Sequence, residues 1–329
     1  MKAKSVSVLA AIRRRCRAGI LLPFLFAPYL ALADSPGVRT AMPVSAVPDS
    51  GPCRKAAMQK PGESFPDVPG GDIFGFTSPS DVGNPGDCAI AFELSGRVGK
   101  ADGRYRAVTL KTQFSATITE NLAIAVAPFA THHAIGGGIH RDDRNRTRFD
   151  GLSGEISYRF IDRSSANPLA ATLSFEPRWA LIDSGSGATA TSYTAEFKLL
   201  IDAVLAAGRL YAALNLNYAP ATQHLAGQSA WVSSSSTNLS GAIAYQFSDR
   251  AFGGLELRHQ TTFEGATLRR NIGRALFAGP TALVKLGEST TLNFVWTPQI
   301  RGRSTASARR LDLDNFERHQ FRMKFVMGL

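Results

Sequence analysis

Three observations in the sequence predict an all-β protein, a transmembrane antiparallel β-barrel of about twelve strands. Apolar and polar side chains alternate along segment after segment between residues 88 and 329, right up to the C-terminal Leu329. Each segment has about the ten residues that a tilted membrane strand requires. The connections alternate between short and longer ones, as the periplasmic turns and outer loops of outer-membrane barrels do.

Residues 1–33 are expected to be a secretory signal. They carry six Lys and Arg and no acid, followed by the apolar run ILLPFLFAPYLALA, and Ala31 and Ala33 give a small-x-small cleavage pattern. A membrane anchor is the alternative, but it needs about 20 apolar residues, more than this run provides. Because removal of the signal lowers the formal net charge from +11 to +5, the basic composition is a weak indication of nucleic-acid binding, and we expect none.

Residues 34–87 are expected to form an irregular periplasmic lead-in to the barrel. They are rich in Pro, Gly, Ser and Asp and show neither a helical nor a strand period. We expect the lead-in to dock in part through Phe74 and Phe76. Cys53 and Cys88 remain in the exported chain and are candidates for a disulfide in the oxidising periplasm, although spacing alone does not decide their pairing.

The barrel is expected to occupy residues 88–329. In the first half, segments such as LSGEISYRF and LAATLSFEPRWAL place Leu, Ile, Phe, Tyr and Trp on one face and Glu, Arg, Ser and Thr on the other. In the second half, LYAALNLNY opposes leucine to asparagine, and GGLELRHQ opposes leucine to Glu and Arg. The strands are expected at 88–98, 105–114, 122–129, 152–160, 169–181, 193–202, 210–218, 239–247, 253–260, 276–286, 291–300 and 319–329.

The C-terminal segment HQFRMKFVMGL is expected to be the closing strand. Large apolar residues occupy its odd positions from Phe321 to Leu329, and an even strand count returns the chain to the periplasm, where the last strand can pair with the first. Hydrocarbon cannot satisfy a free backbone N–H, so a membrane sheet must close.

The alternative fold is a soluble secreted sandwich, in which the apolar faces would form a packed core. Two features favour the membrane barrel. Longer loops around 131–149, 219–236, 263–274 and 301–317 alternate with short turns, and aromatic residues lie near strand ends as a girdle would require. The girdle candidates are Tyr158, Trp179, Tyr193, Tyr218, Tyr245 and Trp296. The chain is therefore expected in the outer membrane of a Gram-negative bacterium.

Five motifs carry a resemblance to a known family: DIFGFTSPSDVGNPGD, TENLAIAVAPF, FEPRW, GPTALVKLG and FVWTPQI. Over residues 72–300, the chain resembles uncharacterised Gram-negative outer-membrane β-barrels that are labelled as transporters and linked to phenol degradation. The resemblance implies a barrel transporter, and no catalytic residues are carried over from this group. The chain differs from this group by being more basic, and Leu329 replaces the Phe that often ends a closing strand, which we expect to weaken the insertion signal slightly.

Charged residues of both signs fall on the polar faces and are predicted to line a pore. They are Glu93, Arg97, Lys111, Glu155, Arg159, Glu176, Arg178, Glu196, Lys198, Asp202, Glu256, Arg258, Arg322 and Lys324. Such a lining would bias the passage of small polar or charged solutes. The alternative is a salt-bridged interior that conducts little, because a twelve-strand barrel lies between filled small barrels and wide porins.

We expect no enzyme activity, no cofactor and no metal site. A lipid-modifying barrel enzyme would need a serine beside a histidine base, and the strand of His259 carries no serine. His132, His133 and His140 with the nearby aspartates Asp142 and Asp143 match no defined metal-ligand spacing.

The expected partners are outer-membrane lipid and lipopolysaccharide, the barrel-assembly machinery and an unidentified small solute. Arginines in the stretches GGGIHRDDRNRTR and RGRSTASARR would suit the phosphates of lipopolysaccharide at the outer rim, although a merely soluble loop would have the same composition. A structural or adhesive barrel that acts through these basic loops is the alternative function.

Overall fold

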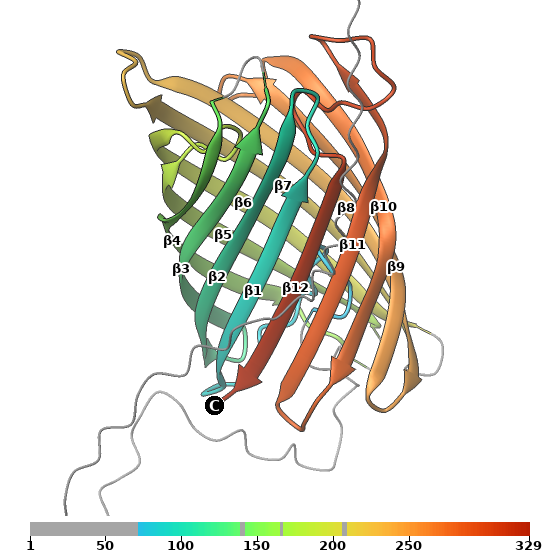
Figure 1. Cartoon of the computed structure of the whole chain (residues 1–329). Coiled ribbons are helices and arrows are strands. Elements are labelled where there is room, and N and C mark those ends of the chain that lie inside the picture. The colour runs from blue at the N-terminus through green and yellow to red at the C-terminus, as the bar shows by residue number, and fades with distance from the viewer. Residues whose placement is uncertain (1–71, 139–141, 165–166, 206–208) are drawn as a thin grey trace, which may run out of the picture. The chain divides into compact units, whose positions relative to one another are not determined.

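The alternating segments form twelve antiparallel strands that close into one barrel (Figure 1). The computed structural model describes residues 72–138, 142–164, 167–205 and 209–329, all of them within the compact unit Ser50–Leu329. The strands are β1 (Cys88–Val98), β2 (Arg104–Thr119), β3 (Leu122–Gly136), β4 (Arg144–Ile161), β5 (Leu169–Ile182), β6 (Thr189–Leu205), β7 (Leu210–Leu225), β8 (Val232–Ser248), β9 (Ala251–Glu264), β10 (Arg270–Lys285), β11 (Thr290–Ser304) and β12 (His319–Gly328).

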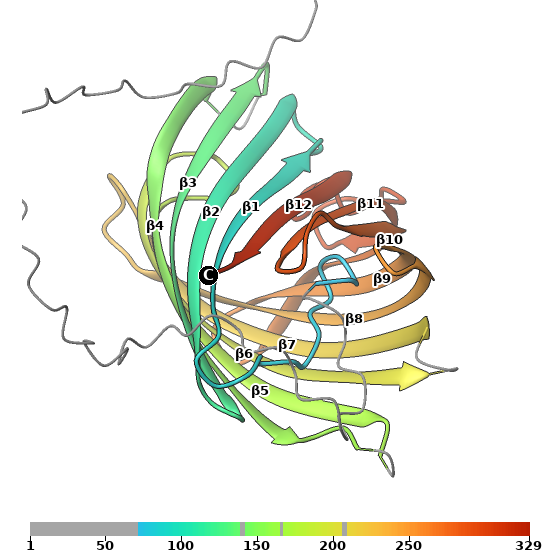
Figure 2. The same cartoon turned by 90° about the horizontal axis from the view of Figure 1, so that it is seen from below.

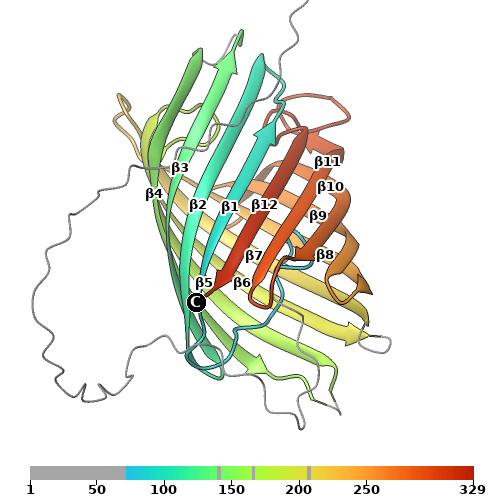
Figure 3. The ribbon, with the colours of Figure 1, turned by 60° about the horizontal axis from the view of Figure 1, so that its bottom comes forward.

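The barrel closes where β12 lies beside β1, as Figure 3 shows. Phe92 of β1 lies opposite Phe325 of β12, and the N–H of Leu329 donates to the carbonyl of Cys88 at 2.9 Å. Closure gives every strand two neighbours, which a sheet in hydrocarbon requires. The prediction that the C-terminal segment is the closing strand is confirmed.

The seam between β1 and β12 contains a glycine that an aromatic ring covers. Gly96 of β1 lies opposite Phe321 of β12, and the Phe321 ring occupies the space that a side chain at Gly96 would need. Without a Cβ at Gly96, the ring can lie flat over the neighbouring strand and cover its backbone.

The two faces of the barrel wall differ as expected for a membrane protein. Large apolar side chains face outward and remain exposed, for example Leu173 at 54% and Ile243 at 52%. The inward residues of the same strands are small or polar and buried, for example Ser174 at 5% and Ser240 at 1%. A soluble sandwich would cover its large apolar side chains, so this band marks the surface that lies in the lipid of the Gram-negative outer membrane.

Most of the strands are longer than predicted, and most of the predicted longer loops are in fact short. The connections at the outer end of the barrel are 99–103, 137–143, 183–188, 226–231, 265–269 and 305–318, and among them only 305–318 is long. Residues 233–237, SSSST, belong to β8 and pair with β7 and β9. The apolar alternation ends where the bilayer ends, but the hydrogen-bonded ladders continue beyond it with polar residues. For that reason apolar periodicity could not mark the strand ends.

Residues 72–82, called the inner segment below, enter the barrel at the end where Leu329 lies (Figure 2). Ile73 and Phe74 are fully buried and pack among inward residues of β6–β10, including Tyr211, Phe252 and Leu283. The inner segment is thus an irregular stretch of chain inside the lumen, where irregular backbone is tolerated because protein covers it. Among the described residues, no helix is long and apolar enough to cross a bilayer.

Candidate functional site: the lumen and its inner segment

Two adjoining cavities occupy the half of the lumen bounded mainly by β1–β7. One has a volume of about 420 Å³ and lies against the inner segment, and the other, of about 560 Å³, extends toward the outer loops. They adjoin because four residues line both, namely Glu93, Lys111, Glu176 and Glu196. Ten of the fourteen residues predicted to line a pore border one or both cavities: Glu93, Arg97, Lys111, Glu155, Glu176, Arg178, Glu196, Lys198, Arg322 and Lys324.

A network of opposite charges forms the wall between the two cavities. Lys198 donates to Glu155 at 3.1 Å and to Glu176 at 2.5 Å, and Lys111 donates to the other oxygen of Glu176 at 2.7 Å. The amide of Asn217 donates to Glu196 at 2.8 Å. These pairs hold the side chains against the strands, so the network narrows the lumen without filling it.

The outer cavity carries two of the predicted arginines. Arg97 and Arg178 both line it, and the Arg178 guanidinium lies 4.1 Å from the centroid of the Phe129 ring. A guanidinium stacked on an aromatic face keeps its charge available to the cavity. The outer part of the lumen is therefore more basic than the middle.

The other four predicted residues do not line these cavities. Arg159, Asp202, Glu256 and Arg258 contact the inner segment, a role that the sequence did not indicate. The signal that could have revealed it is the pair of acids at Asp72 and Asp81 in the lead-in, which are complementary to excess arginine and lysine on the inward strand faces.

Glu256 and Arg258 of β9 hold the middle of the inner segment. Glu256 accepts hydrogen bonds from the Phe76 N–H at 2.8 Å and from the Thr77 hydroxyl at 2.9 Å. The Arg258 guanidinium lies 3.8 Å from the centroid of the Phe76 ring. The Phe76 ring thus packs against the Arg258 guanidinium, whereas Phe74 lies in the apolar cluster.

Gly75 lets the inner segment approach β9 closely. Its φ is +88°, and an added Cβ would lie 2.5 Å from an oxygen of Glu256 and 2.8 Å from Thr281. Only glycine adopts this backbone conformation without strain, and only glycine fits here.

A second anchor binds the later part of the inner segment to β4, β6 and the β4–β5 turn. Asp202 accepts from the Ser80 N–H at 2.5 Å, and Arg163 forms ion pairs with Asp202 and, at 3.0 Å, with Asp81. Arg159 lies 3.7 Å from the same Asp81. Burial lowers the pKa of Arg163, but Asp81 and Asp202 raise it by more, and the net shift is upward.

A third anchor joins the start of the inner segment to β12. Asp72 accepts from Lys324 at 2.5 Å and lies 3.5 Å from Arg322, which in turn lies 3.6 Å from Glu93. Burial alone would raise the pKa of Asp72, but Lys324 and Arg322 lower it below its ordinary value. Asp72 is therefore an ionised link between the inner segment and the closing strand.

The structure describes only some of the cysteine and histidine residues that the sequence singled out. Cys88 is disulfide-bonded, but Cys53 lies outside the described residues, as do residues 1–33 and most of the lead-in. His140 also lies outside them, and the described part of the chain holds no group of three His, Cys, Asp or Glu side chains arranged for a metal. His259 lies on the outer wall opposite Leu239 and Leu276.

Comparison with known proteins identifies a family and a fold. The sequence model of a family described as "Family of unknown function (DUF6662)" matches residues 67–329. No curated protein matches the chain. An outer membrane channel from Pseudomonas putida F1 is similar in structure, with a TM-score of 0.50, 10% identity, and coverage of 81% of this chain and all of that one.

Two further structures are less similar. They are a KdgM porin in complex with disordered oligogalacturonate (TM-score 0.44, 12% identity, 73% of this chain and 99% of that chain) and a NanC porin (0.44, 10%, 73% and 100%). At 10% identity, the likeness to the Pseudomonas channel concerns the fold alone, an outer-membrane barrel. The comparisons support an outer-membrane barrel family and give no support to the label linked to phenol degradation.

Proposed function

Because the chain belongs to the DUF6662 family, whose function is unknown, its activity has to be argued from the barrel, and we propose a narrow outer-membrane channel for small polar or charged solutes. The observation that carries this proposal is the pair of adjoining, charge-lined cavities in a closed barrel. A lumen filled by salt bridges would leave no such cavities.

The inner segment defines the narrow part of the proposed path. Its Ile73 and Phe74 fill the β6–β10 side of the lumen, and Phe76 packs against Arg258 of β9. Solutes would pass beside the inner segment, along Glu176, Glu196 and neighbouring residues. Charges on such a short path act at close range and select solutes by sign and size. The inner cavity is lined by six carboxylates and four cationic side chains, and this balance favours cations there.

The proposal includes no catalytic step and no cofactor. His259, the histidine weighed as a possible base, lies on the outer wall opposite Leu239 and Leu276. As for assembly, we propose that the barrel-assembly machinery inserts the chain through its C-terminal strand.

Planar-bilayer recording of the purified mature protein tests the proposal. We expect small, discrete current steps in KCl, with a preference for cations. Liposome swelling with neutral sugars of increasing size should give a sharp cut-off at a small size. An absence of both current and swelling, with a barrel that shows the heat-dependent gel shift of a folded state, would contradict the channel.

A further inference from the structure

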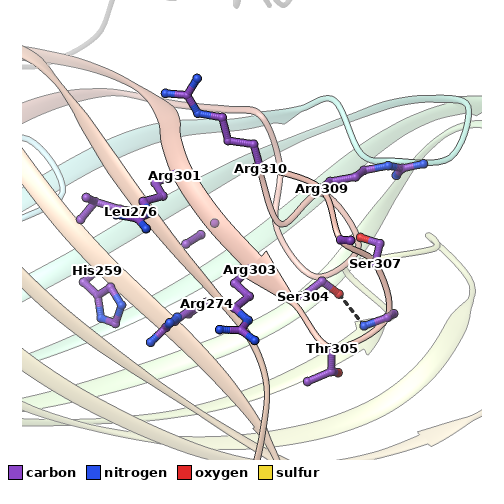
Figure 4. Close-up of a pocket in the computed structure, with 14 residues that line it drawn as sticks. His259, Arg274, Leu276, Arg301, Arg303, Ser304, Thr305, Ser307, Arg309 and Arg310 are labelled. Atoms are coloured by element: carbon purple, nitrogen blue, oxygen red, sulfur yellow. Dashed lines mark hydrogen bonds between the residues drawn. The ribbon is translucent and has the colours of Figure 1, made fainter.

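A cavity of about 960 Å³ lies on the outer wall of the barrel, at the far end of β9–β11 from Leu329 and beneath the β11–β12 connection (Figure 4). It differs from the lumen in the direction of its side chains. Ala275 and Phe277 of β10 face the lumen and are 1% and 0% exposed. Arg274 of the same strand faces outward and is exposed. The cavity therefore opens on the side of the barrel that meets lipid.

Five arginines line this cavity, which we call the arginine pocket: Arg274, Arg301, Arg303, Arg309 and Arg310. Arg309 lies 3.8 Å from Asp314, but the other four have no carboxylate within ion-pair distance in the described ranges. Like charges gathered at one place repel one another unless an anion lies among them. The composition of the arginine pocket thus indicates an anionic ligand.

The connection that carries Arg309 and Arg310 is held against the strands. The N–H of Gly302 donates to the carbonyl of Arg310 at 3.0 Å, and the N–H of Thr305 donates to the carbonyl of Ile272 at 3.0 Å. Asp312, fully buried, accepts from Asn315 at 3.0 Å. The backbone thus places guanidinium groups from β10, β11 and the connection around one space before a ligand binds, which lowers the entropic cost of binding.

The height of the pocket on the wall identifies the kind of anion. Along β11, the outward positions run from Phe294 and Trp296 through Ile300 to Arg301 and Arg303. Tryptophan on an outer wall marks the membrane interface, so the arginines that follow lie at the level of the outer-leaflet head groups. Phosphate is the anion found at this level, and the planar guanidinium fork matches its oxygens.

We propose that the arginine pocket binds the phosphate groups of one lipopolysaccharide molecule, with the acyl chains along the wall at Leu257 and Leu276. The proposal rests on the outer wall alone and is independent of conduction through the lumen. A free phosphate ion offers the same oxygens but no acyl chains, so the two sources can be separated by experiment.

Native mass spectrometry of lipopolysaccharide-free mature protein, refolded in detergent, tests this proposal. We expect one molecule of bisphosphorylated lipid A per barrel. R301Q/R303Q should weaken this binding by about tenfold or more because two charge-assisted contacts are lost. R301K/R303K should bind with intermediate strength, since it keeps the charge and loses the fork.

The control R146Q/R250Q removes two exposed arginines that lie away from the pocket and should bind lipid A like the wild type. Equal weakening by this control would overturn the proposal in favour of general charge attraction. If dephosphorylated lipid A bound as tightly as the bisphosphorylated form, phosphate recognition by the pocket would be contradicted. If inorganic phosphate bound as tightly as lipid A, the claim that the ligand is a lipid would be contradicted. The gel shift on heating should confirm that each variant is folded.

Discussion

The ammonium group of Lys324 in β12 lies 2.5 Å from the carboxylate of Asp72, 252 positions earlier in the chain. This ion pair joins the start of the inner segment to the closing strand, inside the lumen and largely protected from water. Because a buried partner of a broken ion pair loses its compensation, the inner segment should be sensitive to the charge of Asp72.

Asp72→Asn is expected to loosen the inner segment. Loss of a charge-assisted contact should shift the docked state by about 1.5–3 kcal/mol, which corresponds to about 10- to 100-fold in its equilibrium. Planar-bilayer recordings should show larger or more frequent openings than in the wild type. Asp142→Asn, which alters an exposed loop acid paired with Arg144, should leave the currents unchanged.

Acidification should loosen the inner segment of the wild-type protein, as Asp72→Asn does at neutral pH. The pKa of Asp72 in the docked state lies below its ordinary value of about 3.9. The ionised carboxylate therefore stabilises the docked inner segment fully above about pH 3.9, and this stabilisation is lost as the pH falls through the lowered pKa. Openings should therefore increase in this acidic range. In Asp72→Asn this part of the pH dependence should be absent, and an identical profile in both proteins would show that other groups control it.

Gly75→Ala should displace the inner segment without any change of charge. The added Cβ would meet Glu256 and Thr281, and the backbone at φ +88° is unfavourable for alanine. Phe74 and Phe76 should become cleavable by chymotrypsin in the folded barrel. Gly137→Ala has a similar φ of +66° but nothing near its Cβ, so it should leave the inner segment protected.

Two substitutions of opposite charge test the selectivity of the lumen. Glu196→Gln removes a negative charge while its amide oxygen can still accept from Asn217, and it should lower the cation-to-anion permeability ratio by about twofold or more. Lys111→Gln should raise the ratio. Reversal potentials in a KCl gradient measure both changes, and a shift in the same direction for both would contradict a path along these residues.

The Phe321 ring that covers Gly96 between β1 and β12 is expected to stabilise the barrel. Phe321→Ala should expose the backbone at Gly96 and lower the free energy of unfolding by about 1–3 kcal/mol, less than the 3–5 kcal/mol typical of a buried Phe because lipid still contacts the site. The urea midpoint of the barrel in detergent should fall. Phe294→Ala, at an exposed outward position of the neighbouring strand, is the matched control and should have a smaller effect.

The sequence predicted the barrel well because its strands follow one rule, apolar outward and polar inward, which is visible residue by residue. It predicted strand ends poorly because residues such as 233–237 keep their hydrogen bonds beyond the membrane without an apolar face. It also identified inward charges without separating their roles. Glu196 and Glu256 look alike in the sequence, but one lines a cavity and the other binds Phe76, a difference that depends on long-range placement of the irregular lead-in.

The inner segment has a mechanical consequence for the barrel. Hydrogen bonds in a ring of strands fix only the distance between neighbours, so an empty ring of twelve could flatten into an ellipse. Residues 72–82 connect β12 at Asp72 with β6 at Ser80, on the far side of the ring. They therefore hold these two opposite strands at a fixed distance across the barrel. Release of the inner segment would change the cross-section of the pore as well as its free volume.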